Sequence, residues 1–208
     1  MLVKALHRAG TADPLRSDRP RDRRDYNRAM NPAPNLILIG PMGAGKSCIG
    51  RRLAERYGLR LADADREIEQ RTGASVTTIF ECEGEAGFRA RERAALAELL
   101  AGDGVLLATG GGAVLDPGNR QLLRERGFVV HLHVAPEQQL ERLARDRTRP
   151  LLAREDRDAV LRELALVREP LYAEIADLRF DTAQLCAADA TAQLAQQLES
   201  RWQRGTAA

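Results

Sequence analysis

Residues 40–47 read Gly-Pro-Met-Gly-Ala-Gly-Lys-Ser, which is the phosphate-binding P-loop pattern G-x-x-x-x-G-K-[ST]. Residues 35–39 before it form a short apolar run with β-branched side chains, as in a buried parallel strand. Ile49, Leu53 and Tyr57 after it recur at helical spacing. Strand, glycine loop and helix in this order predict a nucleoside-triphosphate site, because the loop amides and the helix N-terminus converge on one anion.

The use of lysine supports this interpretation. Of the 32 lysines and arginines, only Lys4 and Lys46 are lysines. A compact ammonium fits between phosphate oxygens where the broad guanidinium fork of arginine does not. Ser47 supplies a hydroxyl for Mg²⁺. The predicted ATP-binding residues of this segment are Gly43, Ala44, Gly45, Lys46, Ser47 and Cys48.

Composition limits the remaining possibilities. A chain of 208 residues with 44% hydrophobic content suits one folded domain. The net charge of +2 gives no argument for nucleic acid, and no apolar stretch approaches the roughly 20 residues that span a bilayer. The three cysteines are widely separated and lack zinc spacing. We therefore expect reduced thiols in a cytoplasmic protein without nucleic-acid or membrane partners.

The first 29 residues differ from the rest, being dense in Arg and Asp without an apolar period. Such a segment buries too little surface to offset its ordering entropy. We predict a disordered tail or an upstream-start extension, with Met30 as the natural start and the domain at 30–208. A basic arm that binds nucleic acid is the alternative.

Strand-like and helical patterns alternate along the domain, which predicts an open parallel sheet with helices on both faces. A charged segment at about 146–158 with Pro150 reads as a loop. Ligands in such folds bind beyond the carboxyl ends of the strands. The expected further strands are 59–62, 104–108, 128–134 and 178–181, and the expected further helices are 85–100, 117–126, 136–147, 158–168, 170–175 and 187–204, with a helix-prone region at 66–71 and 75–82.

Asp63 and Asp65 follow the second expected strand. Alternation along an extended backbone points both carboxylates the same way. One could hold Mg²⁺ while the other accepts a hydrogen bond or a proton from an alcohol. A solvated turn, or an N-cap by Asp65 for a helix beginning near Arg66, accounts for the two residues equally well.

Gly110, Gly111 and Gly112 follow the third expected strand and remove all side-chain bulk there. This suits a flat ligand against the backbone, although a plain turn is an equal account. Arg89, Arg149 and Arg168 stand out from other arginines, which are mostly surface charges, by the motifs around them.

His131 and His133 alternate on an expected strand and would share one face. That arrangement could bind a metal ion. No third ligand is apparent nearby in the sequence, so we interpret them as ordinary strand residues.

Together these motifs resemble the shikimate kinases, over residues 35–181. The resemblance adds Glu-Ile-Glu at 67–69, Phe-Arg at 88–89 and Ala-Thr-Gly-Gly-Gly-Ala-Val at 108–114 to the P-loop. It continues through Arg-Pro-Leu-Leu at 149–152 and Arg-Glu-Pro-Leu-Tyr at 168–172. The P-loop occurs in many kinases, but this series in this order is specific to the family.

The resemblance implies ATP-dependent phosphorylation of the 3-hydroxyl of shikimate, toward chorismate and the aromatic amino acids. It implies a P-loop α/β fold of the nucleoside monophosphate kinase type, with a five-stranded parallel sheet in the order 2-3-1-4-5 and a lid at about 146–158. It also implies roles for individual residues. Asp65 would bind the ring hydroxyls and be the candidate base, Arg89 and Arg168 would bind the carboxylate, Gly110, Gly111 and Gly112 would contact the ring, Arg149 would reach the ATP phosphates beside the catalytic Lys46, and Asp63 would lie near Mg²⁺ with Ser47.

Two features depart from the family pattern. Cys48 stands where the family commonly has Thr, and the region after Asp181-Thr182 matches poorly, so no adenine contact is assigned. The alternatives are another small-metabolite kinase of this fold, such as a gluconate kinase, and a non-catalytic ATP-binding module. The expected partners are ATP and shikimate, and the expected state is a monomer.

Overall fold

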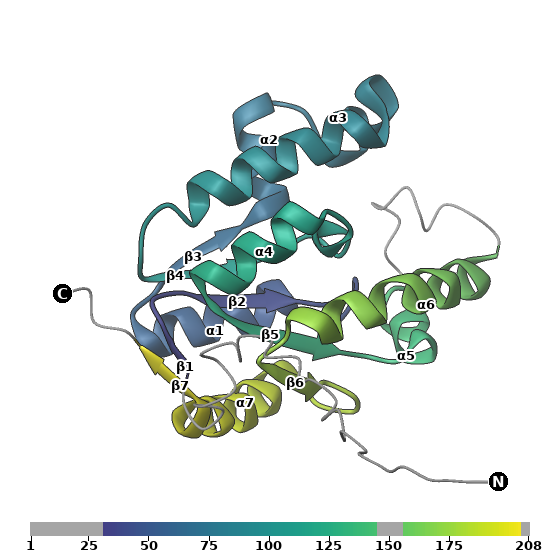
Figure 1. The fold of residues 1–208 in the computed structure, drawn as a ribbon. Coiled ribbons are helices and arrows are strands. Elements are labelled where there is room, and N and C mark those ends of the chain that lie inside the picture. Colours follow the sequence, from purple (N-terminus) through teal and green to yellow (C-terminus); the bar gives the residue numbers. More distant parts are fainter. Residues whose placement is uncertain (1–30, 145–155, 205–208) are drawn as a thin grey trace, which may run out of the picture.

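The computed structural model describes residues 31–144 and 156–204, and its centre is a five-stranded parallel sheet (Figure 1). Its order is β3-β4-β2-β5-β6, with every neighbouring pair parallel. Counted from the predicted strand at 35–39, this is the predicted order 2-3-1-4-5, which is confirmed. The strands are β2 (Leu36–Ile39), β3 (Arg60–Asp63), β4 (Val105–Ala108), β5 (Phe128–His133) and β6 (Leu178–Asp181).

Helices cover both faces of the sheet (Figure 1). Leu36 and Leu38 of β2 pack with α1 and α7 on one face. Ile37 and Ile39, which point the opposite way, pack with α3, α4 and α6 on the other. The helices are α1 (Lys46–Tyr57), α2 (Ala64–Thr72), α3 (Val76–Leu99), η1 (Ala113–Leu115), α4 (Pro117–Arg126), α5 (Pro136–Arg142), α6 (Arg157–Ile175) and α7 (Ala187–Arg201).

A second, two-stranded parallel sheet joins β1 (Asn31–Ala33) to β7 (Trp202–Arg204). The prediction that residues 202–204 belong to the last helix is wrong. The Trp202 indole donates a hydrogen bond to the Ala33 carbonyl at 2.9 Å and lies edge-on to Tyr57 at 5.4 Å. Packing of this one large aromatic side chain therefore ends α7 and leaves the last three residues extended.

The helical segments at 158–168 and 170–175, predicted as two, form the single helix α6 with Pro170 inside it. A proline there removes one intrahelical hydrogen bond to Leu166, which is 79% exposed, so water can reach that turn. Conversely, α3 is interrupted at Gly84 (φ 69°), as the separate predictions at 75–82 and 85–100 indicated. Helix α5 ends at Arg142, earlier than the predicted 147.

Two predicted regions lie wholly or largely outside the described residues. The tail at 1–29 is one of them, and residues 146–155 of the predicted lid are the other. Of the remaining lid residues, Arg157 and Asp158 begin α6 and are helical rather than loop. No helix within residues 31–144 and 156–204 is both long and apolar enough to cross a membrane.

The parallel sheet gathers the candidate residues at one edge. Strand β2 leads into the P-loop, β3 ends at Asp63, and β4 leads into Gly110–Gly112. The three strands are adjacent and parallel, so their carboxyl ends meet. This edge is where ligands bind in open α/β sheets.

Candidate active site

The P-loop folds as a glycine-dependent turn between β2 and α1. Gly40 has φ 137°, and a Cβ there would overlap the carbonyl oxygen of Leu132 on the neighbouring strand. Gly45 (φ 92°) is the N-cap residue of α1 and provides no side-chain cap. The first-turn N–H groups of α1 therefore lack a side-chain cap, as in helix N-termini that bind anions.

Lys46 lies back over its own loop. Its Nζ donates to the carbonyl oxygens of Gly40 at 2.7 Å and Pro41 at 2.8 Å. Neutral carbonyls are weaker partners for an ammonium than phosphate oxygens, so a nucleotide could replace them. The loop opens into a cavity of about 820 Å³. Its lining includes Gly43, Gly45, Lys46, Ser47, Cys48, Asp63, Asp65, Thr109, Gly111 and Arg142.

Asp63 connects the P-loop to the end of β3. Its Oδ2 accepts a hydrogen bond from the Ser47 hydroxyl at 2.7 Å, and its Oδ1 accepts one from the Arg66 amide at 3.4 Å. Asp63 is therefore the N-cap of α2, and the alternative assignment of that role to Asp65 is wrong. The extended alternation expected for the two aspartates is also wrong, because α2 begins at Ala64 and Asp65 lies in its first turn.

A second cavity, of about 450 Å³, lies beside the first. Its polar lining comes from α2, α3, α6 and the loop after β4. Asp65 and Gly111 line both cavities, so the two spaces meet there. The polar and glycine residues of the second cavity are Asp65, Glu85, Arg89, Glu92, Gly110, Gly111, Gly112, Glu163 and Arg168.

Arg89 is held in this cavity by two carboxylates on its own helix. Its Nη1 donates to Glu92 Oε2 at 2.7 Å, and its Nη2 donates to Glu85 Oε1 at 3.1 Å. Glu92 is fully buried, and burial raises the pKa of its carboxyl group, although Arg89 opposes the shift. Glu92 Oε1 accepts no hydrogen bond from the described residues. The ion pair thus fixes one guanidinium at the cavity wall.

Arg89 and Asp65 occupy the space that side chains at positions 112 and 110 would fill. A Cβ on Gly112 would lie 2.8 Å from Arg89 Cζ, and a Cβ on Gly110 would lie 2.8 Å from Asp65 Oδ1. Heavy atoms do not approach a Cβ that closely. Glycine at these two positions therefore lets Arg89 and Asp65 close over the loop, a reason that neither of the two accounts given from the sequence, a flat ligand or a plain turn, had included.

Arg168 brings a second guanidinium from α6. It is only 8% exposed, and within the described part of the chain its Nε has no hydrogen-bond partner. Its Nη1 would lie 3.5 Å from a Cβ on Gly111. Tyr172, one turn later, donates its hydroxyl to the Gly111 carbonyl at 2.6 Å, and burial raises the pKa of that hydroxyl. This turn of α6 is thus anchored to the glycine loop.

Arg142, at the end of α5, was not predicted from the sequence. Its Nη1 donates to the Gly43 carbonyl and to the Thr182 hydroxyl, both at 3.0 Å. It therefore ties the P-loop to the segment after β6, the region where the sequence matched no adenine contact. The sequence could not have singled out Arg142 among the many arginines, because its contacts join segments that are far apart in the chain.

A family model described as shikimate kinase matches residues 42–199. The shikimate kinase of Stenotrophomonas maltophilia (strain K279a) is 63% identical over 175 residues, which cover 84% of this chain and 97% of that protein. The chain belongs to the shikimate kinase family. The shikimate kinase of Xanthomonas campestris pv. campestris (strain 8004) is 60% identical over 173 residues, 83% of this chain and 96% of that protein.

Solved structures agree with this family. A shikimate kinase from Acinetobacter baumannii in complex with shikimate superposes with a TM-score of 0.78 at 47% identity, covering 81% of this chain and 94% of that one. A gluconokinase from Sinorhizobium meliloti 1021 gives 0.55 at 22% identity, over 81% of this chain and 98% of that one, which shows the shared fold alone.

For this member of the shikimate kinase family, the structure brings together most residues predicted from the sequence. Arg149 lies outside the described residues. Glu92 is a buried residue of the site that was not predicted from the sequence. Its spacing of three from Arg89 on an expected helix was the available signal, but charged pairs at that spacing are also common on surfaces.

Proposed function

We propose that this chain transfers the γ-phosphoryl group of ATP to the 3-hydroxyl of shikimate, a step toward chorismate and the aromatic amino acids. The observation that carries the proposal is the meeting of two cavities at Asp65 and Gly111. One is lined by the P-loop, and the other by two guanidinium groups and bare backbone. A triphosphate and a small cyclic acid would fit end to end.

Arg89 and Arg168 are proposed to bind the carboxylate of shikimate. Guanidinium forks bind carboxylates through paired hydrogen bonds. Arg168 Nε is a buried donor without a partner in residues 31–144 and 156–204, which a bound carboxylate would satisfy. Arg89 is oriented by Glu92 and Glu85, so less rotamer entropy is lost on binding. Gly110, Gly111 and Gly112 would lie against the ring.

Asp65 is proposed to accept hydrogen bonds from the ring hydroxyls and to act as the base that takes the proton of the attacking hydroxyl. Its place at the boundary of the two cavities supports this role. Phosphoryl transfer depends mainly on in-line positioning and charge neutralisation, so a carboxylate that orients one hydroxyl is sufficient.

Ser47 and Asp63 fit a Mg²⁺ ion, because a hydroxyl and a carboxylate at the P-loop are the oxygen donors that this ion prefers. The ion, when bound, would neutralise charge on the transferring phosphate. Lys46, with Gly43, Ala44, Gly45 and Cys48, would bind the phosphates, and Arg149 is proposed to reach them as well. Arg142, which lines the P-loop cavity, is a further candidate nucleotide contact.

A substrate panel tests the proposal. ADP release would be measured with ATP, Mg²⁺ and, in turn, shikimate, gluconate and nucleoside monophosphates. Turnover with shikimate alone is expected. Turnover with gluconate would establish the other small-metabolite kinase, and tight ATP binding without turnover on any polyol acid would favour a non-catalytic module.

A further inference from the structure

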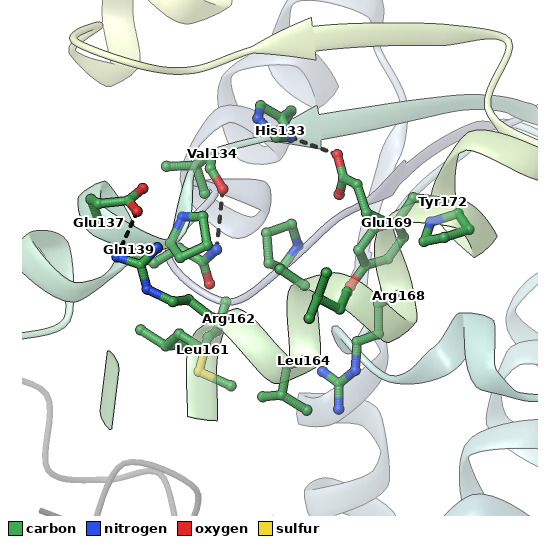
Figure 2. Close-up of a pocket in the computed structure, with 16 residues that line it drawn as sticks. His133, Val134, Glu137, Gln139, Leu161, Arg162, Leu164, Arg168, Glu169 and Tyr172 are labelled. Atoms are coloured by element: carbon green, nitrogen blue, oxygen red, sulfur yellow. Dashed lines mark hydrogen bonds and ion pairs between the residues drawn. The ribbon is translucent and has the colours of Figure 1, made fainter. Parts of the chain in front are cut away.

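His131 and His133 of β5 face Glu169 of α6, on the face of the sheet that α6 covers. His133 Nδ1 lies 2.7 Å from Glu169 Oε1, and His131 Nε2 lies 3.6 Å from Glu169 Oε2. Figure 2 shows Glu169 reaching toward His133, while the neighbouring Arg168 points to the other side of α6. The sequence showed no third ligand beside the two histidines. Tertiary structure supplies one, from 36 residues along the chain.

The surroundings of His131 are a second observation, independent of the cluster of three residues, that indicates a ligand. It is fully buried, and neither ring nitrogen has a hydrogen-bond partner in the described structure. Its ring stacks on Tyr172 at 4.8 Å between centroids, so its direction is fixed. A buried nitrogen without a partner is costly unless something binds it.

We propose that His131, His133 and Glu169 form a binding site for a zinc ion or a similar transition-metal ion. Two imidazoles and one carboxylate are a common zinc ligand set with an open fourth position. Tetrahedral coordination at bond lengths of about 2.1 Å places ligand atoms about 3.4 Å apart. The candidate atoms all lie within 4.8 Å of one another, so the longest separation must shorten by at most about 1.4 Å to reach that value.

The surroundings leave the fourth position open to solvent. His133 and Glu169 line a third cavity, of about 630 Å³, between β5, α5 and α6 (Figure 2). It adjoins the second cavity, with which it shares Met42, Leu164 and Arg168, but neither active-site cavity is lined by His133 or Glu169. A water molecule in this cavity can complete the coordination. His131 forms the buried side of the site, and Glu169, whose side chain is 37% exposed, forms the open side.

A nearby cation restricts which ion can bind. Arg179 Nε lies 3.9 Å from Glu169 Oε1. Mg²⁺ and Ca²⁺ bind through charge and prefer several oxygen ligands, which this site lacks. Zn²⁺ and similar transition-metal ions bind imidazole nitrogens more tightly than Mg²⁺ and Ca²⁺ do. The site therefore selects against the ion proposed for Ser47 and Asp63.

The test measures metal binding rather than activity, so it is independent of the proposed function. Tag-free protein would be dialysed against micromolar Zn²⁺ with excess Mg²⁺, which occupies the P-loop site, and zinc per chain would be measured by atomic emission. The variants are His133→Gln and Glu169→Gln. Glu174→Gln is the matched control, because it removes a carboxylate from the same helix that pairs with Arg120 instead.

We expect one zinc ion per chain in the wild type and in Glu174→Gln, and an affinity loss of about 100-fold or more in the other two variants. Co²⁺ in place of Zn²⁺ should give the visible absorption of a tetrahedral site with nitrogen and oxygen ligands. Equal binding by all four proteins would assign the metal to the exposed thiols Cys48, Cys82 and Cys186 and overturn the proposal. No retained zinc in any of them would overturn it as well.

Circular dichroism would verify folding of each variant. If His133→Gln fails to fold, Glu169→Gln decides alone, because its side chain is partly exposed and the change is isosteric. Thermal unfolding provides a second readout. Added Zn²⁺ should raise the Tm of the wild type and of Glu174→Gln by linkage, and should leave the Tm of Glu169→Gln unchanged.

Discussion

Replacing Arg168 with alanine tests the proposed carboxylate site most directly. Arg168 is 8% exposed and presents a donor, Nε, that has no partner in the described part of the chain. A hydrogen bond to a charged group contributes about 1.5–3 kcal/mol. Each 1.4 kcal/mol is a factor of ten, so shikimate affinity should fall about 10- to 150-fold.

The assay is coupled ADP release, with the KM for shikimate and for ATP measured separately, together with calorimetric titration of shikimate. The KM for ATP should stay nearly constant, because the P-loop cavity does not include Arg168. Arg162→Ala is the matched control on the same helix. Its side chain is 53% exposed and pairs with Glu137 and Asp158, so shikimate affinity should not change.

An Arg168→Ala protein that is folded and binds shikimate with unchanged affinity would refute the carboxylate assignment. Arg168→Lys separates charge from geometry. It keeps the positive charge but loses the planar fork, so we expect an affinity between those of the wild type and the alanine variant. A loss of affinity that accompanies a large drop in Tm in both variants would instead indicate a structural role.

The other predictions concern neighbouring parts of the site. Lys46→Ala should lower kcat by about 100- to 1,000-fold, and Lys46→Arg should not restore it, since the guanidinium is too broad; normal kcat in either variant would count against a phosphate contact. Gly112→Ala should displace Arg89 and raise the KM for shikimate about tenfold, and it should also lower the urea midpoint, because the buried Glu92 would lose its ion-pair partner; an unchanged KM would contradict the assignment of Arg89. Tyr172→Phe should lower the free energy of unfolding by about 1 kcal/mol, through loss of the hydrogen bond to Gly111, and an unchanged urea midpoint would contradict this. Chelation of Mg²⁺ by EDTA should abolish ADP release, and added Mg²⁺ should restore it.

Local patterns determined much of this fold. Apolar runs of four or five residues marked β2 and β4. The predicted helix at 117–126 is α4, and it begins there because the Asp116 side chain accepts the Asn119 amide and proline suits a first turn. The P-loop glycines and Lys46 could be identified without coordinates, since their chemistry depends on residues close together in the chain.

Contacts between residues that are distant in the chain could not be predicted from such local patterns. The end of α7 depends on Trp202 meeting Ala33, and the start of α2 at Ala64 could not be located from the alternation of Asp63 and Asp65. Local propensity predicted the type of most elements, although not of β1, η1 and β7, and packing decided where several of the helices end.

By itself, the sequence determined the nucleotide loop, the parallel sheet and the set of residues at its carboxyl edge, because spacing along the chain encodes secondary structure and short motifs. Only the tertiary structure decided which partners the charged side chains meet: Arg89 the buried Glu92, Arg142 the Gly43 carbonyl, and Glu169 the His133 ring. The physical reason is that charged side chains look alike in a sequence. Their burial and partners, which set their energies, are fixed when separate elements pack against one another.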